Sequence, residues 1–120
     1  MPVVTIEGVP STVSALKVNM VIRPGIKKAV ADVAGLNVSS GDVSVFVHQE
    51  NFEDSGFAST QRDIVVFVDL FNDAHRTDEV LTELAKAIVK KIKEFEFAKN
   101  SLVEVFPRPL NRKTFWSSGI

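Results

Sequence analysis

Few groups in this 120-residue chain are suited to chemistry, and Pro2 is the most distinctive of them. If Pro2 is the first residue of the chain, its nitrogen is a secondary amine, and its ring holds that amine in place at the start of a predicted strand. An α-amine has a pKa near 8, and burial or a nearby cation lowers that pKa by disfavouring the charged form. Such a base can remove a proton from the carbon beside a carbonyl, provided that a cation or amide donors stabilise the enolate.

Other kinds of site are poorly supported by the composition. The chain has no cysteine, which excludes disulfides, thiolate metal sites and cysteine nucleophiles. His48 and His75 lie far apart with no ligand spacing, so no metal site is expected. No nucleophile elbow or phosphate-binding loop is present.

Charge and hydropathy limit the partners and the location. A net charge of −1 gives no reason to expect nucleic acid as a partner. No apolar run approaches the length of a membrane span, and the first residues lack the pattern of a signal peptide. We therefore expect no membrane partner and a cytoplasmic location.

Four segments have the apolar, β-branched composition of strands: 3–7, 43–47, 64–71 and 102–106. The third is almost continuously apolar, which is typical of a strand that is buried on both faces. Gly8 and Pro10 are expected to end the first strand, and Pro107 and Pro109 the last. The polar segment 49–63 predicts a long loop, of a length that is often functional.

Two helices are predicted between these strands. Apolar residues follow mostly helical spacings from position 16 to position 36, but Pro24 removes a backbone donor, so a kink or a break is expected there. Thr77 is a good N-cap for the second helix, because Asp78 and Glu79 follow it in the first turn. The apolar face of the second helix, at steps of three or four, comprises Leu81, Leu84, Ile88, Ile92 and Phe95.

This order of elements predicts one α/β domain over residues 1–120, an α+β sandwich made of two tandem βαβ units. Strands joined through a helix should be parallel with right-handed crossovers. The economical architecture is a four-stranded mixed sheet with both helices on one face. The strands carry many aromatic residues for a face exposed to water, so we expect other subunits to cover part of the sheet. These aromatic residues are Phe46, Phe67, Phe71 and Phe106.

The segment Met1-Pro2-Val3-Val4-Thr5-Ile6, the tandem βαβ order and the chain length resemble the tautomerase superfamily that uses an amino-terminal proline. The nearest type is the one-chain, two-unit form of macrophage migration inhibitory factor and malonate semialdehyde decarboxylase. The segment 114–119, with the single Trp116, is similar to their Trp-containing carboxyl end. The resemblance implies that Met1 is removed and that Pro2 acts as the catalytic base or acid in keto–enol chemistry. It also implies a homotrimer without a cofactor, with sites at subunit interfaces.

The resemblance implies further residues for a small-molecule site. Relatives hold a substrate carboxylate with arginines after the third strand, where Arg76 is the only arginine that fits. Arg108 and Arg112 follow the fourth strand and are candidates to reach a neighbouring subunit's pocket. The candidate apolar walls of the site are Phe46, Phe71 and Phe106. The family's lysine, tyrosine and asparagine are not matched, since Leu36-Asn37, Val103 and Val105 stand at those places and the chain has no tyrosine.

Three functional interpretations remain open from the sequence. The leading one is a cofactor-independent tautomerase, or a related lyase, that acts on a small 2-oxo acid or enol. The second is a non-catalytic trimeric module whose pocket has lost its polar partners, which the unmatched lysine, tyrosine and asparagine favour. The third is an interaction protein of ferredoxin-like layout with no small-molecule site.

Overall fold

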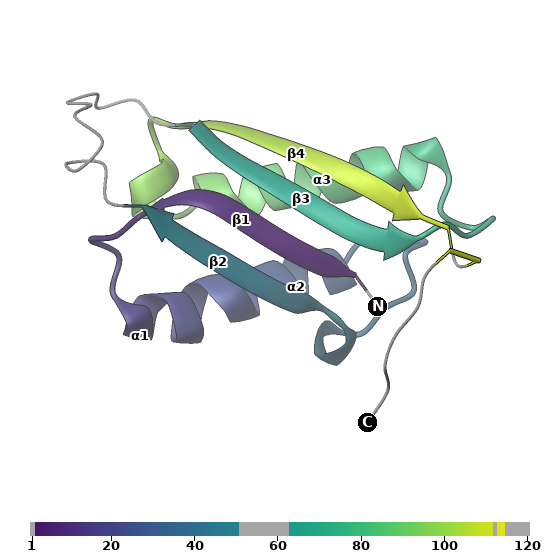
Figure 1. Ribbon diagram of the computed structural model, residues 1–120, viewed down its shortest axis with the longest axis horizontal. Helices are drawn as coiled ribbons and strands as arrows, with labels where there is room; N and C mark the ends of the chain where they lie inside the picture. The colour runs from purple at the N-terminus through teal and green to yellow at the C-terminus, as the bar shows by residue number, and fades with distance from the viewer. Residues whose placement is uncertain (1, 51–62, 112, 115–120) are drawn as a thin grey trace.

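The computed structural model describes residues 2–50, 63–111, 113 and 114. Four strands form one sheet, and helices cover only one of its faces, behind the strands in the view of Figure 1. The strands are β1 (Val3–Pro10), β2 (Ser44–Glu50), β3 (Asp63–Phe71) and β4 (Leu102–Leu110). The predicted architecture, a four-stranded sheet with helices on one face, is confirmed.

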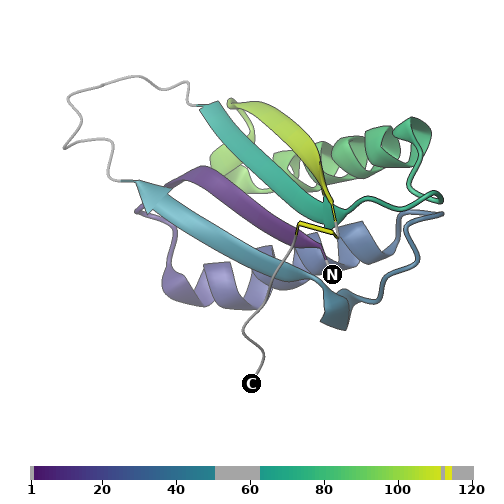
Figure 2. The same ribbon diagram turned by 45° about the vertical axis from the view of Figure 1, so that its right-hand side comes forward.

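The strand order is β2-β1-β3-β4. The strands that a helix connects are parallel, β1 with β2 and β3 with β4, as the sequence predicts. The two βαβ units join through the central strands β1 and β3, which are antiparallel. The sheet is therefore mixed, and the start of β1 lies between the start of β2 and the end of β3, as Figures 1 and 2 show.

Helix α3 (Asp78–Lys93) follows the predicted pattern closely. The Thr77 hydroxyl accepts a hydrogen bond from the Val80 N–H at 3.3 Å, which satisfies one of the free donors of the first turn. Three side chains of α3, Leu84, Ile88 and Ile92, are buried against the sheet. No helix among the residues that the structure describes is long and apolar enough to cross a membrane.

The first crossover is one continuous helical segment made of α1 (Ala15–Lys17), the π-helix η1 (Val18–Ile22) and α2 (Arg23–Ala31). The interruption that the sequence predicts near Pro24 takes the form of this π-helix, and the segment does not break. The wider turn directly before Pro24 accommodates the missing donor, since π-bulges loosen the ordinary i→i−4 ladder.

Two short 3-10 turns complete the described elements: η2 (Ser40–Asp42), which leads into β2, and η3 (Glu96–Ala98), which follows α3. The Ser39 hydroxyl donates to the Asp42 carboxylate at 2.9 Å, and the Ser39 N–H donates to the same oxygen at 3.3 Å. These two bonds hold the pKa of Asp42 below its usual value, so this capping contact is ionised at neutral pH.

The first and the last strands of the chain, β1 and β4, run past the residues that were expected to end them. β1 continues through Gly8, where the pairing register with β2 shifts and the backbone adopts a φ of +94°. β4 continues through Pro107 and Pro109 to its last residue. The Leu110 carbonyl accepts from the Asn72 N–H, directly after β3. Alternation along β4 therefore turns the two prolines toward the outer edge, where no ladder donor is needed.

The core lies between the sheet and the helices. Alternate residues of the central strands, such as Val4 and Ile6 of β1 and Val66 and Val68 of β3, are buried there. The residues between them point to the opposite, open face, because strand side chains alternate. Two phenylalanines of that open face, Phe46 and Phe106, are 49% and 45% exposed. In the part of the chain that the structure describes, aromatic side chains are therefore exposed on the face without helices.

Candidate functional site

Pro2 lies directly before β1 and is buried. Its carbonyl accepts a hydrogen bond from the Ser44 N–H at 3.0 Å, which ties it to the start of β2. On the other side, Val3 pairs with Asp69 of β3, so the last residues of β3 run past Pro2. The Pro2 nitrogen thus lies at the end of the sheet where β1 and β2 begin and where β3 and β4 finish.

Arg76 also lies at this end of the sheet. Its Nη1 donates to the Phe71 carbonyl at 2.8 Å, and its side chain is partly buried. The Asn72 N–H donates to Leu110 of β4, so by strand alternation the Phe71 carbonyl faces β1. The Arg76 guanidinium therefore occupies the β1 side of the end of β3, at the next ladder position beyond Pro2.

A short turn between β3 and α3 positions Arg76. The Asp73 carboxylate accepts from the His75 N–H at 2.9 Å, and the Asp73 carbonyl accepts from the Arg76 N–H at 2.9 Å. An aspartate that binds the backbone two residues ahead is a common way to fix a turn. The N-cap at Thr77 follows at once, so the backbone at Arg76 is held on both sides.

Arg108 is placed by β4, beside Asp69 of β3. The two residues are register partners, and they form a two-point ion pair with nitrogen–oxygen distances of 2.8 and 2.9 Å. The Arg108 guanidinium carbon lies 4.3 Å from the centroid of the Phe67 ring. That ring stacks on Phe106 with a centroid distance of 5.8 Å. Arg108 is therefore held both by a carboxylate and by an aromatic face.

The three candidate wall residues lie in different places. Phe71, the last residue of β3, lies beside the Arg76 contact. Phe46 and Phe106 lie on β2 and β4, the two opposite edges of the sheet, with β1 and β3 between them. At about 4.8 Å per strand, their backbones are roughly 14 Å apart. One chain therefore does not bring Phe46 and Phe106 together around a single small ligand.

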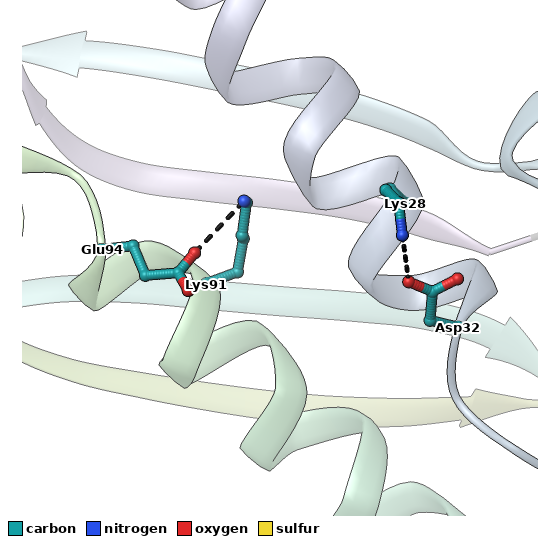
Figure 3. A network of polar contacts seen from close by, with 4 residues as sticks. All are labelled: Lys28, Asp32, Lys91 and Glu94. Atoms are coloured by element: carbon teal, nitrogen blue, oxygen red, sulfur yellow. Dashed lines mark hydrogen bonds and ion pairs between the residues drawn. The ribbon is translucent and has the colours of Figure 1, made fainter.

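The hollows that the described residues line lie along α2 and α3, and one of them also includes Pro107 of β4. One of about 350 Å³ lies between α2 and α3, and Gly25 is among the residues that line it. Lys28 and Asp32 form an ion pair at 2.6 Å on one side of it, and Lys91 and Glu94 form another at 3.2 Å on the other side (Figure 3). These pairs are exposed and are of the kind that contribute little to stability.

Sequence reasoning did not single out Asp69 or Phe67 as site residues. A signal for Asp69 was present, because it is the one charged residue inside the apolar run 64–71. Its partner could not be found in the same way, since it lies 39 positions away and pairs through strand register. Arg112, Trp116 and most of the predicted long loop, residues 51–62, lie outside the described residues.

No protein-family model matches the chain, and none of the curated proteins matches it. Solved structures do match its fold. A fused 4-oxalocrotonate tautomerase, described as a wild-type asymmetric trimer, has a TM-score of 0.75 at 14% identity and covers 98% of this chain and 94% of its own. Pt0534, inactivated by 2-oxo-3-pentynoate, has a TM-score of 0.75 at 22% identity, with 98% and 93% covered.

Macrophage migration inhibitory factor of Toxoplasma gondii matches with a TM-score of 0.69 at 14% identity, and 98% of this chain and 97% of that one are covered. At these identities the likeness establishes the fold. The chain thus has, over nearly its whole length, the fold of the tautomerase superfamily, which is the fold that the sequence resemblance implies.

Proposed function

We propose that this protein is a cofactor-independent tautomerase, or a related lyase, that acts on a small 2-oxo acid or its enol. Pro2, with Met1 removed, is the general base. The observation that carries the proposal is the contact between Arg76 and the Phe71 carbonyl, because it sets a cation at the ladder position next to the Pro2 nitrogen. The fold likeness to tautomerases supports the same reaction class.

The proposed reaction is a proton transfer. The Pro2 nitrogen takes a proton from C3 of the 2-oxo acid, and the electron pair of that C–H bond forms the C2–C3 double bond. The carbonyl oxygen becomes an enolate and takes up a proton from water, and the Pro2 ammonium returns its proton to the solvent, so the base is regenerated. Arg76 holds the substrate carboxylate with the guanidinium donors that do not bind Phe71, so that C3 lies against Pro2. Phe71 is the apolar wall closest to that carboxylate in the chain, and it contributes shape and not charge.

In the proposed site Arg76 also lowers the pKa of the Pro2 amine. A cation beside an amine disfavours the protonated amine and lowers its pKa below the usual value near 8. The unprotonated amine is the active form, so the lower pKa increases the fraction of active enzyme at pH 7. Burial of Pro2 acts in the same direction, because it also disfavours the ammonium form.

We expect Arg76→Gln to weaken catalysis in two separable ways. KM for phenylpyruvate should rise by about tenfold to a hundredfold, the scale of a lost charge-assisted contact. The ascending, acidic limb of the pH–rate profile should also move to higher pH, because the amine loses its neighbouring cation and its pKa rises. Steady-state enolisation across pH 5–9, followed by absorbance, measures both effects.

Lys86→Gln is the control for Arg76→Gln, since it removes a positive charge from the exposed side of α3. It should leave KM and the pH profile unchanged. An Arg76→Gln protein with a normal KM and a normal pH profile would rule Arg76 out as the carboxylate holder.

We further propose that the protein is a homotrimer in which neighbouring subunits cover part of the open sheet face. The exposed Phe46 and Phe106 support this, because large apolar side chains exposed on an uncovered sheet face are typical of interfaces. Solved neighbours described as trimers support it as well. In a trimer, a second copy can bring its Phe106 to the site that begins with the Pro2 of the first copy. One chain alone does not bring Phe46 and Phe106 together.

Sedimentation equilibrium at micromolar concentration should give about three times the chain mass of 13.2 kDa. Phe106→Glu should shift the assembly toward smaller species, because it places a charge in an apolar contact. Lys90→Glu, on the helical layer, should leave the assembly intact. A stable wild-type monomer would contradict the proposal.

The alternative, a non-catalytic trimeric module of the same fold, has one specific observation in its favour. Arg108 is already neutralised by Asp69 and packed on Phe67, as expected for a structural contact and not for a free ligand-binding group. Absence of turnover with several 2-oxo acids, in protein from which Met1 has been removed, would favour this module over the enzyme.

A further inference from the structure

The Asp69–Arg108 pair lies in the same row of the open face as Val3, the residue that follows Pro2. Both carboxylate oxygens of Asp69 accept from Arg108, and the Asp69 side chain is only 24% exposed, against 51% for Arg108. Geometry of this kind, with two parallel bonds, is the most specific form of arginine–carboxylate contact. Arg108 is therefore oriented by its own chain before any ligand arrives.

The two arginines at this end of the sheet differ in their charge balance. Among the residues that the structure describes, Arg76 makes one hydrogen bond to a neutral carbonyl and no ion pair, whereas the charge of Arg108 is balanced by Asp69. The nearest acidic residue in the Arg76 turn, Asp73, directs its carboxylate to the His75 N–H. Of these two arginines, only Arg76 therefore offers a ligand a charge that no carboxylate of the described residues balances.

We propose that Asp69 sets the charge class of the substrate. By holding Arg108, it restricts the site to 2-oxo acids with a single carboxylate and excludes dicarboxylates. This inference rests on the proposed function, and Asp69 acts as a specificity-determining residue without touching the substrate.

The exclusion follows from what a second carboxylate would have to do. To reach Arg108 it must displace Asp69, which would leave that partly buried carboxylate without its partner and close to another negative charge. Selectivity built on such an unpaired charge is a common form of discrimination between ligands. Asp69 and Phe71 are two residues apart on β3, roughly 7 Å along the strand. A freed Arg108 and Arg76 would then be spaced for the two ends of a short dicarboxylate.

The test compares 2-oxopentanoate with 2-oxoglutarate, which share a five-carbon chain and differ by one carboxylate. Dissociation constants are measured by NMR titration of the assembled protein without Met1. Wild-type protein should bind 2-oxopentanoate at least tenfold more tightly than 2-oxoglutarate. Asp69→Asn, which is nearly isosteric, should gain at least tenfold in affinity for 2-oxoglutarate and change little toward 2-oxopentanoate.

Two further variants locate the effect. Asp63→Asn removes the same charge from the same strand and face, but at the far end from Pro2, and it should change neither affinity. Arg108→Gln in the Asp69→Asn background should abolish the gain for 2-oxoglutarate. An equal gain in affinity for 2-oxoglutarate in Asp63→Asn would overturn the inference, and so would the absence of any such gain in Asp69→Asn.

The wild-type protein alone also decides the question, should a variant fold poorly. Binding of 2-oxoglutarate as tight as that of 2-oxopentanoate, or binding of neither, overturns the inference. Phenylpyruvate turnover in the same samples tests the proposed function separately. The expected affinities without turnover would support the role of Asp69 in substrate selection and reject the tautomerase activity. Turnover without a gain in 2-oxoglutarate affinity in Asp69→Asn would support the activity and reject that role.

Discussion

A protein that keeps Met1, or that carries a tag fused before Pro2, will lose at least a hundredfold of its phenylpyruvate enolisation rate. The reason is chemical: in the retained chain the Pro2 nitrogen belongs to an amide and has no basic lone pair. General bases contribute about 10²- to 10⁴-fold to proton transfers, which sets the expected size of the loss. Absorbance of the enol, followed with matched protein concentrations, measures it.

The same protein can serve as its own control. A tag whose proteolytic removal leaves Pro2 as the first residue should restore the rate, which separates the amine from any effect of the tag on folding. Pro2→Ala should weaken activity less than a retained Met1, because a primary amine remains at the same place. Equal turnover before and after cleavage would show that Pro2 is not the base.

The fold was predictable because its signals are local. The i+3 and i+4 spacing of Leu84, Ile88 and Ile92, behind an N-cap at Thr77, defines α3 from the sequence, and these side chains are buried as the pattern requires. The βαβ order then fixes which strands are parallel, since a helical crossover leaves little alternative. The mixed sheet followed from joining two such units.

The ends of the strands were less predictable, because glycine and proline have more than one use in a sheet. Gly8 was expected to end β1, but it forms a bulge within it. Pro107 and Pro109 were expected to end β4, but they lie in an edge strand with their nitrogens turned outward. Whether such a residue ends a strand depends on which neighbour it faces, and strand pairing decides that.

The residues of the candidate site also differ in how far the sequence could predict them. Arg76 could be proposed because the family that the sequence resembles carries arginines after the third strand, and it lies at the Pro2 end. The role of Pro2 and the wall residues Phe46, Phe71 and Phe106 remain predictions. Asp69 was not proposed, because its significance depends on the register that brings Arg108 opposite it. Cross-strand contacts of this kind are absent from local sequence patterns, so the charge balance of the site became visible only with the sheet.

The largest effect on stability is expected at Gly8. A Cβ there would lie 2.5 Å from the carbonyl oxygen of Asp63, and the φ of +94° is strained for any side chain. The oxygen belongs to the backbone of β3, so it cannot move away as a flexible side chain would. Strained backbone of this kind costs about 1–3 kcal/mol, and the contact adds to it, so Gly8→Ala should lower the unfolding free energy by about 3 kcal/mol or more.

Gly41→Ala is the matched control for Gly8→Ala, because its new Cβ would meet only the Ser39 hydroxyl at 3.9 Å, an ordinary contact. It should stay within about 0.5 kcal/mol of wild type. Urea unfolding gives the free energies, and the Tm of Gly8→Ala should fall by roughly 10 °C for a chain of this size. A Gly8→Ala protein as stable as Gly41→Ala would mean that β1 does not carry the bulge. The pairing register of the first residues of β1 with its neighbouring strands would then be different.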